Sequence, residues 1–105
     1  VKRFNAYSYF LLTKSMDSHN VARDRALSSE VLTKEEKMKN VLKKIKAKTI
    51  CIGISSDHLC PVDEQKFLAE NISGAKFAEI DSPFGHDGFL VEGEKIGELV
   101  KEFLK

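Results

Sequence analysis

The stretches Lys48-Thr-Ile-Cys-Ile-Gly-Ile-Ser-Ser-Asp57 and Lys76-Phe-Ala-Glu-Ile-Asp-Ser-Pro-Phe-Gly-His86 decide the fold of this chain. Each is a short apolar run that is followed at once by a polar loop. A short run that is rich in β-branched residues and apolar on both faces is typical of a buried parallel strand. We therefore expect strands at residues 49–54 and 77–80.

Helical patterns follow both predicted strands. Pro61 suits the first turn of a helix, where its missing N–H is not needed, and Gly74 supplies a stop. Residues 92–104 form the second predicted helix. Its apolar stripe is Ile96, Leu99, Val100, Phe103 and Leu104, and that of the first is Phe67, Leu68 and Ile72. The order strand, helix, strand, helix predicts an α/β fold with two parallel strands. Because so small a sheet is marginal, we expect further strands from a preceding segment or another chain.

Two further helices are expected in the first half of the chain. Residues 5–17 begin with a plausible N-cap, Asn5, and are apolar on most sides, so the helix needs cover either from a partner or as part of a core. Residues 18–32 are polar and indicate a loop or a short irregular helix. Residues 33–46 begin with a capping box of Thr33 and Glu36 and continue with an apolar face. That face is Met38, Val41, Leu42 and Ile45.

Length and composition restrict the class of protein. The 105 residues suit one domain with a small core, and a net charge of +1 argues against nucleic-acid or membrane-surface binding driven by bulk charge. No apolar run approaches membrane-spanning length. The start has neither a hydrophobic signal region nor an initiating Met, so we expect a chain that begins inside a longer gene product. The two cysteines, Cys51 and Cys60, are too few for a structural zinc site or a disulfide framework, which favours a reduced, cytoplasmic protein with no bound metal.

The chemistry is expected in the loops after the two strands. The carboxyl ends of parallel strands meet at one edge of the sheet, so Asp57 and His86 are predicted to lie side by side. A carboxylate there would fix the tautomer of the imidazole and stabilise its protonated form. An Asp and a His in such loops are common in α/β proteins, so the pattern alone leaves a catalytic relay open. His19 and His58 are predicted to have no role, and no motif marks Ser55, Ser56 or Ser82 as a nucleophile.

Three motifs carry a resemblance to one enzyme family. The segment Phe4-Asn-Ala-Tyr-Ser-Tyr-Phe-Leu-Leu-Thr-Lys-Ser-Met-Asp-Ser-His19 resembles a lid segment of the homoserine O-acetyltransferases. The segment Ser56-Asp-His-Leu-Cys-Pro61 resembles their catalytic-acid loop, and Ser82-Pro-Phe-Gly-His-Asp-Gly-Phe-Leu90 resembles their catalytic-histidine loop. The three motifs stand in the family's order and span nearly the whole chain.

The resemblance implies an α/β-hydrolase fold with a Ser-Asp-His triad. The family moves an acetyl group from acetyl-CoA, a substrate and not a bound cofactor, to the hydroxyl of homoserine on the route to methionine. Asp57 would be the triad acid and His86 the general base. Asp87 would bind the amino group of the amino-acid substrate, although it could equally be an acid of the loop or of a helix cap.

One part of the family pattern is missing. The fold places its nucleophile in a Gly-x-Ser-x-Gly elbow, which this sequence does not contain. The chain therefore resembles the C-terminal third of the enzyme, with residues 1–32 as the end of the helical lid and residues 33–105 as part of the core. Alone it is expected to be inactive. The alternatives are a non-catalytic module that self-associates, or part of an esterase or a serine acetyltransferase.

Overall fold

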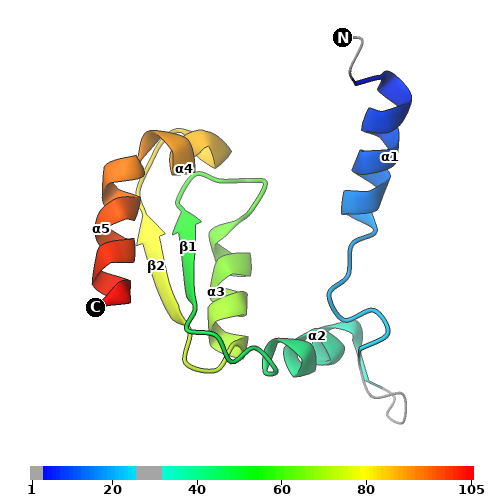
Figure 1. Cartoon of the computed structure of the whole chain (residues 1–105), viewed down its shortest axis with the longest axis horizontal. Coiled ribbons are helices and arrows are strands. Elements are labelled where there is room, and N and C mark those ends of the chain that lie inside the picture. The colour runs from blue at the N-terminus through cyan, green and yellow to red at the C-terminus, as the bar shows by residue number, and fades with distance from the viewer. Residues whose placement is uncertain (1–3, 26–31) are drawn as a thin grey trace.

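The computed structural model describes residues 4–25 and 32–105 and contains helices on both sides of a small sheet (Figure 1). The elements, in chain order, are α1 (Ala6–Asp17), α2 (Lys34–Leu42), β1 (Ile50–Ile54), α3 (Val62–Asn71), β2 (Lys76–Ile80), the 3-10 turn η1 (Gly85–Asp87), α4 (Gly88–Val91) and α5 (Gly93–Leu104). The strand-helix-strand-helix order predicted for the second half is confirmed. The short elements η1 and α4 were not predicted.

The sheet consists of β1 and β2 in parallel, in register from Ile50 opposite Lys76 to Ile54 opposite Ile80. Helix α3 packs against β1 and helix α5 against β2 (Figure 1). The core is correspondingly small. Its buried apolar side chains in this part of the chain are Val41, Leu42, Cys51, Ile54, Ile72, Ile80 and Phe103. The prediction of an α/β arrangement with two parallel strands is therefore confirmed.

Two predicted helix bounds need correction. Helix α2 begins with the predicted capping box, in which Glu36 N donates to Thr33 Oγ1 at 3.2 Å and Thr33 N to Glu36 Oε2 at 2.7 Å. It ends at Leu42 and not at residue 46. The N–H groups of Lys44 and Ile45 donate three residues back, to the carbonyls of residues 41 and 42, and these tighter turns end the helix as the chain turns toward β1. Pro61 lies at the N-cap of α3, one residue outside the first turn.

Helix α1 stands apart from the sheet (Figure 1). Its N-cap is Asn5, as predicted, whose Oδ1 accepts a hydrogen bond from Ser8 N at 2.8 Å. None of its residues is buried, and its large apolar side chains are exposed: Tyr7, Tyr9, Phe10, Leu11, Leu12 and Met16. The alternative that this helix belongs to the core is thus wrong for the described part of the chain.

Residues 18–25 form turns, in agreement with the predicted loop, and residues 26–31 lie outside the described part of the chain. Asp24 has a positive φ of 58° in these turns. Within residues 4–25 and 32–105, every helix is too short or too polar to cross a membrane.

Candidate active site

Two loops leave the same edge of the sheet. Ile54 and Ile80 are opposite each other at the ends of β1 and β2, so the segments that follow begin at the same level. Ser55 N continues the ladder by donating to Ile80 O at 3.0 Å. The acid loop, residues 55–61, follows β1. The histidine segment, residues 81–88, follows β2. Such an edge is where parallel sheets place their ligand-binding and catalytic groups.

Asp57 is held by three hydrogen-bonding groups. Its side chain is buried, with 6% of its surface exposed. Oδ1 accepts from the backbone N–H groups of Leu59 at 2.8 Å and Cys60 at 2.9 Å. Oδ2 lies 2.9 Å from His86 Nδ1. The backbone N–H of Cys60 is the main group that lowers the pKa of Asp57, with His86 and Leu59 adding to it against the opposing effect of burial. The carboxylate is therefore the favoured form.

The His86 ring is oriented from two sides. It belongs to η1, and its Nδ1 faces Asp57. Phe89 packs against it edge to face, with the ring centroids 5.5 Å apart. The side chain is 44% exposed. When Nδ1 carries the hydrogen that it donates to Asp57, Nε2 presents a lone pair, as a general base requires.

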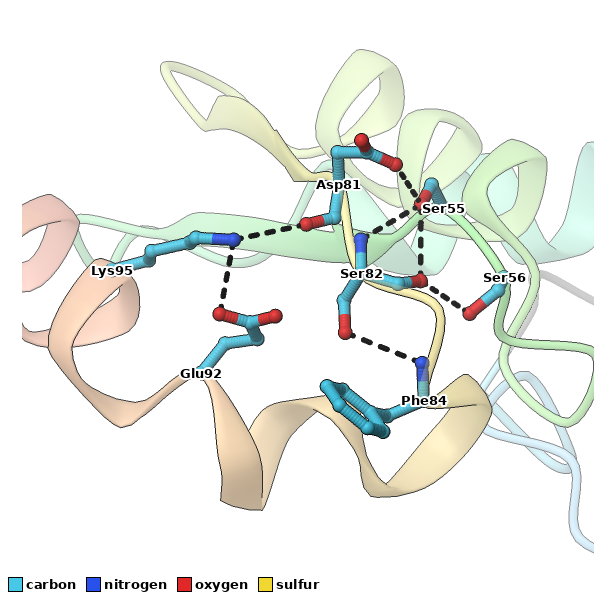
Figure 2. A network of polar contacts seen from close by, with 7 residues as sticks. All are labelled: Ser55, Ser56, Asp81, Ser82, Phe84, Glu92 and Lys95. Carbon is cyan, nitrogen blue, oxygen red and sulfur yellow. Dashed lines mark hydrogen bonds and ion pairs between the residues drawn. The ribbon is translucent and has the colours of Figure 1, made fainter.

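Three serines connect the two loops (Figure 2). Ser55 Oγ donates to Asp81 Oδ1 at 2.8 Å and accepts from Ser82 N at 3.1 Å. Ser56 Oγ donates to Ser82 O at 2.5 Å and accepts from Gly85 N at 2.8 Å. Gly85 is the residue before His86, so Ser56 ties the histidine segment directly to the acid loop.

The histidine segment also packs closely on the sheet. Gly85 has a φ of +59°, a left-handed conformation that side chains disfavour. Gly88 lies so near β1 that an added Cβ would be 2.8 Å from Ile54 Cγ2. Farther along, Lys95 forms an ion pair with Glu92 at 2.9 Å and donates to Asp81 O at 3.1 Å (Figure 2). Lys95 also lowers the pKa of Glu92.

The structure brings together only part of the predicted set of site residues. Asp57 and His86 are in contact, as expected, while their catalytic roles stay predictions. Asp87 is exposed beside His86 and makes no side-chain cap to α4. Cys51 is buried, which raises the pKa of its thiol, and Cys60 is exposed.

Sequence reasoning missed the structural role of the three serines. Each of them follows a strand directly or at one residue's distance, and Ser82 is among the most buried side chains, with 2% exposed. The position of these serines just after two paired strands was the sequence signal that could have indicated their structural role. Among the described residues, no serine hydroxyl bonds to His86, whose one hydrogen-bonding partner there is Asp57.

The fold and the site define a class. A parallel strand-helix-strand unit that presents a carboxylate and an imidazole at its carboxyl edge has the chemistry of an acid–base centre. No protein-family model matches the chain.

Curated relatives give the particular family. The chain is 42% identical over 104 residues to the homoserine O-acetyltransferase of Chlorobium chlorochromatii. It is 39% identical over 105 residues to that of Saccharomyces cerevisiae and 37% identical over 105 residues to that of Emericella nidulans. These matches cover 99–100% of this chain but 26%, 20% and 21% of the three relatives. The chain is thus related along its whole length to homoserine O-acetyltransferases, which confirms the resemblance, and it spans a fifth to a quarter of their length.

Proposed function

We propose that this chain is the acid-and-base part of an acyltransferase that moves acetyl from acetyl-CoA to the hydroxyl of homoserine. The observation that carries the proposal is the 2.9 Å contact between His86 Nδ1 and Asp57 Oδ2 at the carboxyl edge of the parallel strands. The naming of the relatives as homoserine O-acetyltransferases supports the reaction. The complete enzyme would have the α/β-hydrolase fold and would work in methionine biosynthesis in the cytoplasm.

The division of the chain follows from the family resemblance. Residues 1–32 would be the end of a helical lid, and residues 33–105 would be the C-terminal part of the core. The exposed apolar side chains of α1 suit a lid element that packs on something outside this chain. The two-stranded sheet suits a part of a larger sheet, because two parallel strands alone are marginal.

The proposed reaction has two half-reactions. His86 Nε2 takes the proton of a serine hydroxyl from outside this chain, the oxygen attacks the thioester carbonyl, the C–S bond breaks, and CoA leaves as the thiol with that proton. His86 then takes the proton of the homoserine hydroxyl, whose oxygen attacks the acetyl-serine ester, and the serine leaves reprotonated. Asp57 stabilises the imidazolium in both steps. Asp87, beside His86, would face the substrate ammonium as a carboxylate.

A chimera tests the proposal. The matching segment of the Chlorobium chlorochromatii enzyme is replaced by this chain, and CoA release is measured with acetyl-CoA and homoserine. We expect turnover in the chimera and none above a blank in the isolated chain, which has no nucleophile elbow. His86→Ala should abolish turnover. His58→Ala, a change at an exposed histidine next to Asp57, is the matched control and should keep it.

A folded chimera without turnover on homoserine would contradict the proposal. Turnover on serine or on a simple ester in its place would assign the chain to a serine acetyltransferase or an esterase. Circular dichroism distinguishes a folded chimera from one that has not folded.

A second candidate is a non-catalytic module that self-associates. The observation that favours it is α1, a helix of 12 residues with no buried residue and with exposed aromatic and aliphatic side chains. Size-exclusion chromatography with light scattering on the isolated chain tests this candidate. A well-folded monomer would count against it.

A further inference from the structure

A cysteine joins the acid and the histidine at the candidate active site. One ligand atom from each of Asp57, Cys60 and His86 lies within 4.8 Å of the other two. Asp57 and Cys60 belong to the acid loop, and His86 belongs to η1 in the histidine segment that follows β2. The scarcity of cysteines argued against a structural zinc site, which is closed by four protein ligands. A set of three ligands with an open position is a different kind of site.

We propose that Asp57, Cys60 and His86 bind a thiophilic divalent cation such as Zn²⁺ or Cd²⁺, and that the bound ion withdraws His86 from proton transfer. Thiolate, imidazole and carboxylate are the donors that zinc takes in proteins. A carboxylate and a thiolate together also balance the charge of a divalent ion. The binding site stands on the structure alone, and only its effect on catalysis rests on the proposed function.

The geometry requires small adjustments. Ligand atoms about 2.0–2.3 Å from one tetrahedral zinc ion lie about 3.3–3.8 Å apart. Asp57 Oδ2 and His86 Nδ1 are 2.9 Å apart, and one carboxylate oxygen of Asp57, one ring nitrogen of His86 and the thiol of Cys60 lie within 4.8 Å of one another. Cys60 is exposed and the His86 side chain is 44% exposed, so both can rotate without disturbing the core.

The acid loop can keep its shape when the ion binds. Asp57 Oδ1 is the atom that accepts from Leu59 N and Cys60 N, and Oδ2 is the atom that faces His86. An ion placed between Oδ2 and Nδ1 would replace the hydrogen that the two atoms share. The loop hydrogen bonds to Oδ1 would remain. The ion would then hold the imidazole by the nitrogen that the relay uses for orientation.

Metal titration of the 105-residue chain tests the site. Co²⁺ is the spectroscopic probe, because a thiolate ligand gives a near-ultraviolet charge-transfer band, and Zn²⁺ affinity follows from competition with a chromophoric chelator. We expect one ion per chain and a thiolate band. Cys60→Ser should remove the band and weaken Zn²⁺ binding by at least about tenfold, the effect that even an outer partner of a metal ligand can have. His86→Ala should also weaken binding.

Two matched controls belong to this experiment. His58→Ala changes an exposed histidine in the same loop, and Cys51→Ala changes the buried cysteine; both should leave Zn²⁺ affinity unchanged. Circular dichroism establishes that each variant is folded. A Cys60→Ser variant that binds Zn²⁺ as tightly as the parent chain would overturn the proposed metal site. One ion shared between two chains, seen by light scattering, would overturn it as well.

The chimera distinguishes Zn²⁺ binding at this site from its proposed effect on catalysis. In an active chimera, Zn²⁺ should inhibit CoA release, and Cys60→Ser should relieve the inhibition. Binding without inhibition would refute the withdrawal of His86 and leave the site standing. An inactive chimera would count against the proposed function alone, since the titration of the isolated chain does not depend on turnover.

Discussion

The two loops at the sheet edge and helix α1 differ in how much of their environment this chain provides. In the loops, Asp57 and Ser82 are buried and hydrogen-bonded, and Ser56 of the acid loop bonds to Ser82 and Gly85 of the histidine segment. In α1, no residue is buried and the large apolar side chains are exposed. Contacts within this chain therefore preorganise the acid and the histidine. The apolar side chains of α1 are not covered by the described residues.

The largest expected effect is that of Asp57→Asn on the activity of the chimera. An amide can hold the ring but favours the wrong tautomer and does not stabilise the imidazolium, so kcat should fall by about 10⁴-fold, as in comparable triads. CoA release at saturating substrate measures it. A fall of less than tenfold would show that the loops are ordered for a purpose other than the relay.

Gly88→Ala should be the most damaging small change to the stability of the ordered region. The added Cβ would lie 2.8 Å from Ile54 Cγ2, so the histidine segment would be pushed off the sheet. We expect the free energy of unfolding to fall by about 1–3 kcal/mol, measured by urea denaturation. Gly97→Ala in α5 is the matched control, because a Cβ there has no neighbour within 4 Å, and it should stabilise by up to about 1 kcal/mol.

Ser56→Ala should loosen the connection between the loops with a smaller effect. It removes the acceptor of Gly85 N and the donor to Ser82 O, for a net loss of about 1 kcal/mol. The specific readout is the NMR signal of the His86 Nδ1 hydrogen, which should broaden or disappear. An unchanged signal would indicate that packing by Phe89 alone suffices to orient the ring.

Lowering the pH should destabilise the acid loop and leave the stability of α1 unchanged. Because the pKa of Asp57 is lowered in the fold, its contribution to stability is complete above the ordinary aspartate range and is lost as pH falls through that lowered pKa. The protection factors of the amides of Leu59 and Cys60, which are exchange rates relative to the intrinsic rate at the same pH, should fall in that window. An equal fall in protection throughout α1 would indicate global unfolding and would contradict a local effect.

Changes on α1 should have the smallest effect on stability. Leu12→Glu alters an exposed side chain, so the free energy of unfolding of the chain should change by less than about 0.5 kcal/mol. Any self-association through α1 should weaken, as measured by light scattering over a range of concentrations. A clear loss of stability in a monomeric sample would mean that the helix packs within the chain.

The strands, the pairing of Asp57 with His86 and the capping box at Thr33 could be predicted from the sequence. Each follows from a local pattern or from the rule that parallel strands end at one edge. The end of α2 could not, because Ile45 continues the apolar spacing although the chain turns there toward β1. Helix periodicity likewise assigned Leu104 to the stripe of α5, yet that side chain is exposed.

The contacts between the loops could not be predicted from the sequence, for another reason. The bonds from Ser55 and Ser56 to the histidine segment join residues 26 to 29 positions apart, and hydroxyl groups leave no periodicity. The nearness of Cys60 to His86 has the same origin. Both depend on how the loops fold after the strands, which is tertiary information.

The parallel pairing of β1 with β2 has a consequence for inheritance. The strand, the crossover helix and the second strand place both Asp57 and His86 within one contiguous stretch, from Ile50 to His86. A recombination event that moves this stretch between genes transfers the pair with its serine contacts intact. Other segments can then be combined with it without separating Asp57 from His86.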